Sequence, residues 1–431
     1  MKVKIAGLLM AIAVANTPIA AQDTMTTHAF QLTFIYPVGT GGVKSVENTY
    51  CVSINVLGGV TGQTKGFEIG SLFNINKYGA RGAQFAGLFN VAGTKNSEIN
   101  SANAQFAGLF NTTSKGKSVQ FAGIFNYGDT TYLQAGGIFN IANESDAQIG
   151  GIFNYGKNVY FQAGGIFNVV NQGIAQFAGI YNYGDTVPFQ AAGIVNTAQE
   201  SKCQIAGIVN VAQESKCQIA GIVNVTKKGR FQAGLINVRD TADGVSLGLI
   251  NIVKKGGIME AGIEAGEFVH TALTFRSGTQ RLYSIVSVGY NYTESSTSRS
   301  FALIGRKGFW TVGGGLGTSF HLVGNLGLNL ELTYNTCYKV WRDPQYREPL
   351  WRHDFFIKFA PMLNYRFAKH FKIYAGPSLN LCVRPDEGIL NDFYHNNRVK
   401  PEQEIPYSIY HRQYRHSKLD MWIGFTGGIK F

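Results

Sequence analysis

Residues 119–127 read VQFAGIFNY, and the alternation within this stretch decides the fold class. Every second side chain belongs to a strongly apolar face, and those between them form a small, semipolar face (Val119, Phe121, Gly123, Phe125 and Tyr127 against Gln120, Ala122, Ile124 and Asn126). A period of two with aromatic and β-branched residues predicts a β-strand. Gly123 is expected where a neighbouring chain segment approaches closely.

The same phrase, roughly Gln-x-Ala-Gly-Ile-x-Asn, occurs thirteen times in the chain. The spacings between its closing asparagines are 16, 21 and 15, then 14 seven times, then 13 and 14. A fixed period predicts one structural unit stacked on copies of itself, whose neighbours complete its packing. The asparagines are Asn74, Asn90, Asn111, Asn126, Asn140, Asn154, Asn168, Asn182, Asn196, Asn210, Asn224, Asn237 and Asn251.

Short polar turns such as residues 128–130 separate the predicted strands. Tyr-Gly follows Asn126, Asn154 and Asn182 but not the asparagines between them, so a deeper period of two repeats is present. Two arrangements fit this alternation. One is an antiparallel meander, and the other is a two-sided β-solenoid in which two strands make one coil and the asparagines stack in ladders. A coil of a single 14-residue repeat would instead bring Cys203 and Cys217 within disulfide distance.

From about residue 257 the repeat gives way to longer alternating strands, typified by residues 326–335 (LGLNLELTYN). Short and long connections alternate in this region, and the chain ends on Phe431 within an alternating strand. Strands with one apolar and one polar face, joined by short turns at one end and long loops at the other, predict a transmembrane β-barrel. A soluble β-sandwich is the alternative, because its strands alternate too.

Two counts of barrel strands are possible. The first count gives a continuous antiparallel sheet of about 22 strands, an even number as in bacterial barrels. It adds two N-terminal strands (about 28–37 and 49–58), thirteen repeats and seven C-terminal strands. One N-terminal strand with the seven C-terminal ones gives an eight-stranded barrel with an inserted β-solenoid. The 22-stranded sheet is favoured, because thirteen repeats leave one over in a coil built from pairs, although its Ile and Leu side chains would face a wet lumen.

The N-terminus has the features of a secretory signal, with Lys2 and Lys4, an apolar stretch from Ile5 to Ala15 and a small-residue tail ending at Ala21. We expect a signal peptide at 1–21, N-terminal β-strands at 22–60, the tandem β-repeat region at 61–256 and membrane β-barrel strands at 257–431. No other stretch approaches 18 uninterrupted apolar residues, so no transmembrane helix is expected. Because the chain is expected to be exported and to form a barrel, we predict that it is located in the cell outer membrane.

Composition and charge narrow the range of partners. The chain is 45% hydrophobic and 15% charged, which fits a β-protein with much non-aqueous contact. Its formal net charge of +12, or +10 without Lys2 and Lys4, favours outer-membrane lipid and lipopolysaccharide. Nucleic acid is excluded, because the basic residues are scattered and the chain is expected to be exported. The five cysteines fit neither a disulfide framework nor a zinc site (Cys51, Cys203, Cys217, Cys337 and Cys382).

The sequence contains no motif for catalysis, cofactor binding or metal binding, so we predict no enzyme, no cofactor and no site residues of these kinds. His411 and His416 lie in the long segment 384–417, where a solvated loop is the simpler interpretation than a metal site. Glu260, Glu264 and Glu267 cluster where the barrel region begins. Glu260 and Glu264 share one strand face, and we expect them to line a lumen or pair with Arg or Lys rather than catalyse.

The terminal aromatic strand resembles the assembly signal of bacterial outer-membrane proteins. Nearly the whole mature chain resembles a family of bacterial outer-membrane proteins with surface repeats, known from gut-type Gram-negative bacteria. The residues that match are 30–37 (FQLTFIYP), the Gln-x-Ala-Gly repeats, 248–251 (GLIN) and 422–425 (WIGF). The resemblance implies an outer-membrane location, this architecture and recognition by the barrel-assembly machinery through the strand ending at Phe431. It implies no catalytic residue.

Two functions therefore remain open. One is a non-enzymatic outer-membrane barrel that acts as a pore or as a structural envelope protein. The other is a surface-displayed binding or adhesion protein that uses the repeat region as a ligand platform. Neither a solute nor a ligand follows from the sequence.

Overall fold

A computed structural model describes residues 25–93, 101–291, 309–339, 355–368, 370–385, 408–414 and 417–431, which are almost entirely β-structure. The chain divides into two compact units, Met1–Ser215 and Lys216–Phe431. The all-β prediction, with tandem repeats and a barrel, is confirmed. The predicted signal peptide and His416 lie outside the described residues.

The first unit is a stack of β-strands that begins with two strands and a 3-10 helix. The bounds are β1 (Thr27–Ile35), β2 (Val38–Gly39), the 3-10 helix η3 (Gly42–Glu47), β3 (Thr49–Gly70), β4 (Phe73–Ala86), β5 (Phe89–Ala92), β6 (Ser101–Ala107), β7 (Phe110–Ala122), β8 (Phe125–Gly136), β9 (Phe139–Gly150), β10 (Phe153–Gly164), β11 (Phe167–Ala178), β12 (Tyr181–Thr186), β13 (Phe189–Ala192) and β14 (Val195–Ala206). The boundary between the units falls within β15 (Val209–Ala220).

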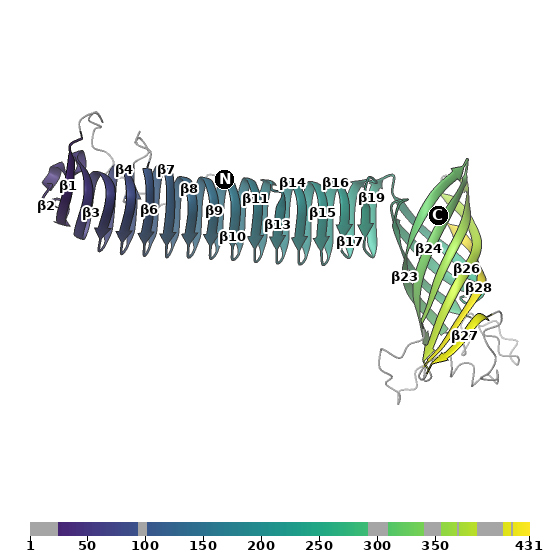
Figure 1. The fold of residues 1–431 in the computed structure, drawn as a ribbon. Helices are drawn as coiled ribbons and strands as arrows, with labels where there is room; N and C mark the ends of the chain where they lie inside the picture. Colours follow the sequence, from purple (N-terminus) through teal and green to yellow (C-terminus); the bar gives the residue numbers. More distant parts are fainter. Residues whose placement is uncertain are drawn as a thin grey trace. The chain divides into compact units, whose positions relative to one another are not determined.

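Each repeat makes one coil of the stack, which we call a rung. Asn140 of β9 pairs in parallel with Asn154 of β10, which pairs in turn with Asn168 of β11, so each step advances the chain by one repeat. Figure 1 shows these strands side by side. Neither the antiparallel meander nor the two-repeat coil is correct. The favoured sheet of about 22 strands is therefore wrong, because the repeats pair in parallel and contribute no strand to the barrel.

The N-terminal strands also belong to the stack. β1 pairs in parallel with β3 and in antiparallel fashion with β2. Neither β1 nor β3 enters the barrel, which corrects both counts made from the sequence, since each used at least one N-terminal strand. These elements cover the first rung, as terminal elements do in other repeat proteins.

The predicted strand 119–127 is interrupted, because β7 ends at Ala122 and β8 begins at Phe125, and the predicted turn 128–130 lies within β8. The amides of the semipolar face turn inward, whereas Ile124 lies at the bend between the two strands and is partly exposed. Gln120 and Asn126 are fully buried, whereas Phe121 remains 37% exposed. Small residues permit this tight coil. A Cβ atom on Gly123 would collide with the carbonyl oxygen of Gly108 in the neighbouring rung, which confirms the close approach predicted for Gly123.

The second unit contains the last rungs and a closed barrel. Strand bounds are β16 (Val223–Ala233), β17 (Ile236–Thr241), β18 (Val245–Leu247), β19 (Ile250–Lys255), β20 (Ile258–Gly266), β21 (Thr271–Gly278), β22 (Tyr283–Asn291), β23 (Phe309–Val323), β24 (Leu326–Lys339), β25 (Phe355–Ala368), β26 (Phe371–Pro385), β27 (Ser408–Tyr414) and β28 (Ser417–Lys430). Antiparallel pairing runs from β20 to β26, then to β28 and back to β20, so eight strands close the barrel. β27 pairs with Ser417–Trp422 of β28, beyond the stretch Thr426–Lys430 of that strand that pairs with β20.

The eighth barrel strand is β20, directly after the repeats, and not an N-terminal strand. Apolar side chains point outward from the barrel, with Leu363 at 53% and Ile423 at 60% exposure. Among the described residues, no helical segment has the length and apolar character needed to cross a membrane.

Candidate functional site

Buried asparagines form a ladder along the rungs. Asn140 Nδ2 donates to Asn154 Oδ1 at 2.9 Å and to the Ile149 carbonyl at 2.7 Å. The same pair of bonds recurs at Asn154, which donates to Asn168 and to the Ala163 carbonyl. Each side-chain amide therefore uses both of its N–H groups and its oxygen inside the stack, which offsets the cost of burying it.

Buried glutamines form a second ladder of opposite polarity. Gln148 Nε2 donates to Gln134 Oε1 at 2.8 Å, toward the N-terminus, and to the Tyr155 carbonyl at 3.1 Å. The asparagines donate toward the C-terminus, so the side-chain amide dipoles of the two ladders run in opposite directions. This arrangement avoids a large net dipole along the stack.

Both ladders end on a suitable acceptor. Gln84 Nε2 donates to the buried carboxylate of Glu68, which occupies the glutamine position of the preceding rung. At the other end, Asn251 Nδ2 donates to Ser284 Oγ at 2.7 Å, and the backbone N–H of Asn251 donates to Ser277 Oγ at 3.0 Å. The last amide of each ladder is thus satisfied by a residue of a different type.

The barrel interior holds a network of buried charges. Arg276 Nε and Nη2 each lie 2.8 Å from one oxygen of Glu331, and Nη2 lies 3.2 Å from Glu264. Lys358 Nζ also contacts Glu264, and the Tyr283 hydroxyl donates to Glu331 at 2.8 Å. These groups come from β20, β21, β22, β24 and β25, so the network ties together strands that are distant in the sequence.

A smaller cluster lies beside this network. Glu260 contacts Lys372 and lies 3.0 Å from Lys430 Nζ. The predicted role of Glu260 and Glu264 as partners of Arg or Lys inside a lumen is confirmed. The sequence did not identify their partners. The signal available in the sequence was that Arg276, Glu331 and Lys358 fall on the polar face of their alternating strands, which is the face that this barrel turns inward.

The connection between β20 and β21 fills the end of the barrel opposite the start of β20. Phe268 packs against Phe356 and Trp422, with ring centroids 4.8 and 5.3 Å apart. Beside it, Glu267 accepts hydrogen bonds from Asn380 Nδ2 at 3.0 Å and from the Trp422 indole N–H at 3.0 Å. Glu267 therefore does not join Glu260 and Glu264 but holds Phe268 across the lumen, where Phe268 forms a plug.

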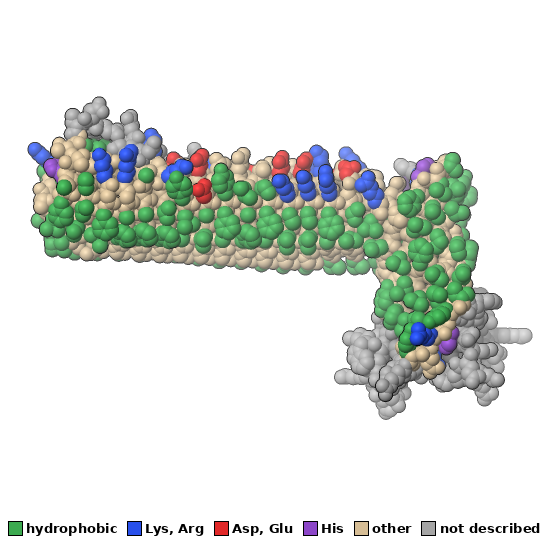
Figure 2. Space-filling model, viewed as in Figure 1, with side chains coloured by type: hydrophobic (Ala, Val, Ile, Leu, Met, Phe, Trp, Pro, Cys, Tyr) green, Lys and Arg blue, Asp and Glu red, His purple; other side chains and the backbone are tan. Residues whose placement is uncertain are grey.

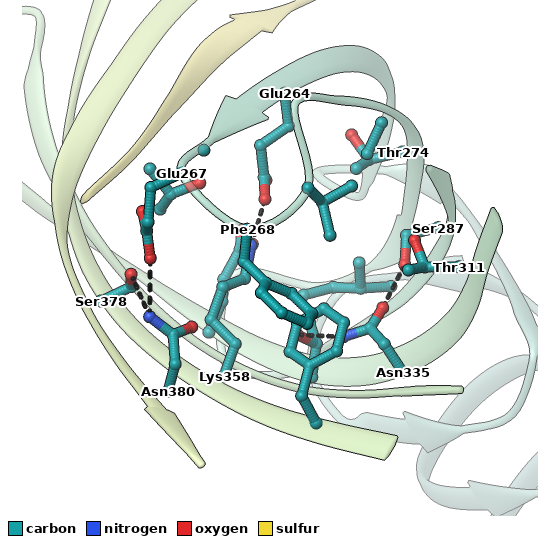
Figure 3. Close-up of a pocket in the computed structure, with 18 of the residues that line it drawn as sticks. Glu264, Glu267, Phe268, Thr274, Ser287, Thr311, Asn335, Lys358, Ser378 and Asn380 are labelled. Carbon is teal, nitrogen blue, oxygen red and sulfur yellow. Dashed lines mark hydrogen bonds and ion pairs between the residues drawn. The ribbon is translucent and has the colours of Figure 1, made fainter. Parts of the chain in front are cut away.

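Little free volume remains between the Phe268 plug and the charged network. Figure 3 shows Phe268 in the centre of this space, with Glu264, Lys358 and Asn335 around it. The cavity that these side chains enclose measures about 40 Å³. Ligand sites usually measure about 300–1,000 Å³, so this cavity has room for a few water molecules at most.

The segment 384–417, where a solvated loop was expected around His411 and His416, is only partly described. Ser408–Tyr414 form strand β27, so His411 lies on a strand and not in a loop. His411 Nδ1 lies 2.6 Å from the buried carboxylate of Asp420, an ion pair when the ring is protonated. No group of three or more His, Cys, Asp or Glu side chains with metal-site geometry occurs in the described ranges. No protein-family model, curated protein or solved structure matches the chain.

Proposed function

We propose that the protein is a non-enzymatic outer-membrane β-barrel protein. Its closed barrel anchors the chain in the membrane, and its repeat region makes the contacts on which its function depends. One observation carries the anchor role: ion pairs and the Phe268 plug fill the lumen. Barrels of eight strands are typically just wide enough for side chains to fill. The outward Leu, Ile and Phe side chains support contact with lipid.

The positions of the short connections support a periplasmic location for the repeats. The described short turns join β21 to β22, β23 to β24 and β25 to β26, at the barrel end where β20 begins and where Phe431 pairs with Ala261. Short turns of outer-membrane barrels face the periplasm. A barrel in that orientation receives the chain from the repeats on its periplasmic side.

A conductance measurement tests the closed anchor. We expect purified, folded protein to stay silent in planar lipid bilayers, because Phe268 and the ion pairs of Arg276 fill the lumen that the described strands enclose. Electrophoretic mobility before and after heating verifies folding in the same sample. Discrete, long-lived channel openings from the folded fraction would contradict the closed barrel and support a function as a pore.

The second candidate, a surface-displayed binding protein, is favoured by the long and regular faces of the rungs. Protease treatment of intact cells separates it from the first. Cleavage within residues 61–256 from outside would support display. Protection in intact cells, with cleavage after the outer membrane is permeabilised, would support the periplasmic side.

A further inference from the structure

In the described rungs from Asn74 to Ser215, charged side chains are confined to one edge of the stack. All twelve Lys, Arg, Asp and Glu residues in residues 74–93 and 101–215 lie three to seven positions after a ladder asparagine. Glu144 and Asp146 follow Asn140, for example, and Lys157 follows Asn154. Figure 2 shows these side chains along one long edge, with rows of hydrophobic side chains across the face beside it. We call this the charged edge.

The opposite edge is apolar throughout. The residue two positions before each of the ten ladder asparagines from Asn74 to Asn210 is Leu or Ile. Ile138, Ile152 and Ile180 are typical, with 38%, 41% and 39% exposure. We call this the Leu/Ile edge. A soluble repeat protein would place polar residues at such exposed turns, so this edge calls for a covering partner.

Both faces between the two edges are apolar as well. On one face Phe110, Phe125 and Phe139 stack with ring centroids 4.9 and 5.0 Å apart. On the other face, Ile149, Phe177 and Ile205 are 49%, 41% and 41% exposed. A second copy of the chain would cover one face and leave the other in water. A fluid hydrocarbon layer covers both faces and the Leu/Ile edge together.

The ladders make such an environment possible. Hydrocarbon offers no hydrogen bonds, so a segment within it must satisfy its polar groups internally. The asparagine and glutamine amides do so within the rungs, and parallel pairing uses the backbone groups. The stack therefore has a polar, hydrogen-bonded centre and an apolar exterior, the reverse of a soluble solenoid.

The dimensions agree with one leaflet. Six to seven residues separate the Leu/Ile edge from the middle of the charged edge, which corresponds to about 20 Å at about 3.3 Å per residue. Half of a bilayer's hydrocarbon core is about 15 Å thick. A rung that stands on its Leu/Ile edge would thus cross the acyl layer and place its charges among the headgroups.

Two shallow grooves on the Ile149 face fit acyl chains. They measure about 980 and 730 Å³ and extend across several rungs. Their floors are the Ala and Gly residues of the repeat, and their walls are Phe and Ile side chains such as Phe106, Phe121 and Ile205. Long, open, apolar grooves suit flexible hydrocarbon chains better than a rigid polar ligand.

We propose that the repeat stack of the first unit is embedded edge-on in a phospholipid leaflet, with the Leu/Ile edge and both faces among the acyl chains and the charged edge at the headgroups. The proposal rests on the proposed function in one respect, that the barrel brings the repeats to a membrane. It adds that the repeats themselves bind lipid.

Depth-dependent fluorescence quenching tests this with the full-length protein. The five native cysteines are replaced by serine, and one environment-sensitive label is attached at a new cysteine. The sites are Ile152→Cys on the Leu/Ile edge, Glu144→Cys on the charged edge and Leu363→Cys on the barrel exterior. Each variant is folded into phosphatidylethanolamine–phosphatidylglycerol vesicles, and quenching by acyl-chain nitroxide lipid is compared with quenching by aqueous iodide. Ile180→Cys replaces the first site if that variant fails to fold.

We expect the labels at Ile152 and Leu363 to be quenched several-fold more by the nitroxide lipid than the label at Glu144, and iodide to show the reverse order. Iodide access at Ile152 equal to that at Glu144, with Leu363 still in lipid, would overturn the embedded stack alone. Protection of Ile152 from both quenchers would overturn it too, in favour of a protein partner. A label at Leu363 without lipid quenching would overturn the membrane anchor instead.

Discussion

At the scale of single residues, amides take the place that apolar side chains hold in most protein cores. Asn154 is fully buried, accepts a hydrogen bond from Asn140 and donates two. Phe153 and Tyr155 on either side of it point outward. Burial of an amide without partners costs about 1–3 kcal/mol, so the ladder is stable only while it is continuous.

A break in the ladder tests this. We expect Asn154→Leu to lower the free energy of unfolding of the repeat region by roughly 3 kcal/mol, because it leaves one N–H of the Asn140 amide and the Asn168 oxygen without their partner and removes the bond to the Ala163 carbonyl. Asn158→Leu, at an exposed position of the same rung, should change it by less than about 0.5 kcal/mol. Urea-dependent proteolysis measures both, and equal effects would contradict the role of the ladder.

Glu68 gives the first rungs a pH dependence. Burial raises the pKa of its carboxyl above the ordinary 4.5, although hydrogen bonds from Gln84, Asn76 and Asn55 oppose the shift. The folded state therefore binds the proton more tightly than the unfolded state does. The resulting contribution to stability is complete below about pH 4.5 and is lost as pH rises through the raised pKa.

We expect the rungs around Glu68 to open more readily at about pH 8 than at about pH 5, after correction for intrinsic exchange, in hydrogen-exchange measurements on β3 and β4. Glu68→Gln should remove this difference, because the amide does not ionise. Glu144→Gln, on the exposed charged edge, is the matched control and should keep it. If the pH dependence persists in the Glu68→Gln variant, another titrating group causes it.

At the scale of elements, the rung is a coil of one repeat that pairs in register with the next, asparagine beside asparagine. The alternation of Tyr-Gly turns is therefore a difference between neighbouring rungs and does not mark two ends of a sheet. Tyr155 lies beside Val169, and Val169 lies beside Tyr183. The deeper period of two repeats has no counterpart in the pairing.

Disulfide formation measures the length of the coil. In a background without native cysteines, we expect Tyr155→Cys with Val169→Cys to oxidise readily, since neighbouring strands lie about 4.8 Å apart and disulfides need Cα atoms about 4.4–6.8 Å apart. Tyr155→Cys with Tyr183→Cys, two rungs apart, should not. Mobility on non-reducing gels distinguishes the two, and the opposite result would restore the two-repeat coil.

At the scale of the molecule, a stack of equivalent rungs is modular. Each rung contacts mainly its neighbours, so removal of a whole rung should leave the remaining contacts intact. The barrel depends on no repeat for its closure, because β20 pairs with β28.

We expect deletion of residues 154–167 to be tolerated, because it joins Phe153 to Asn168 and restores the repeat phrase and both ladders. Deletion of residues 154–160, half a rung, should expose the ladders and make the region sensitive to protease. Heat-dependent electrophoretic mobility reports barrel folding in both variants, and we expect it to be unchanged. Equal protease sensitivity of the two deletions would contradict the rung boundaries.

Much of the candidate site followed from residue patterns. Glu260 and Glu264 were expected to pair with Arg or Lys in a lumen, and they contact Lys372, Lys430, Arg276 and Lys358. Glu267 was grouped with them but contacts Trp422 at the Phe268 plug. Spacing along one strand predicts a shared face, whereas the partners come from strands that only barrel closure brings together.

The sequence by itself determined that the chain is all-β, that residues from about 74 to 251 repeat one unit and that longer alternating strands follow. These properties are local, because period-two alternation and turn residues act within about ten residues. Tertiary structure decided that the rungs pair in parallel, which face points inward and which strands close the barrel. Those choices depend on backbone hydrogen bonds between segments, and the same alternation is compatible with antiparallel pairing. The recurrence of asparagine and glutamine at the same two positions of every rung indicates parallel pairing, because in-register parallel strands place each amide beside an identical one.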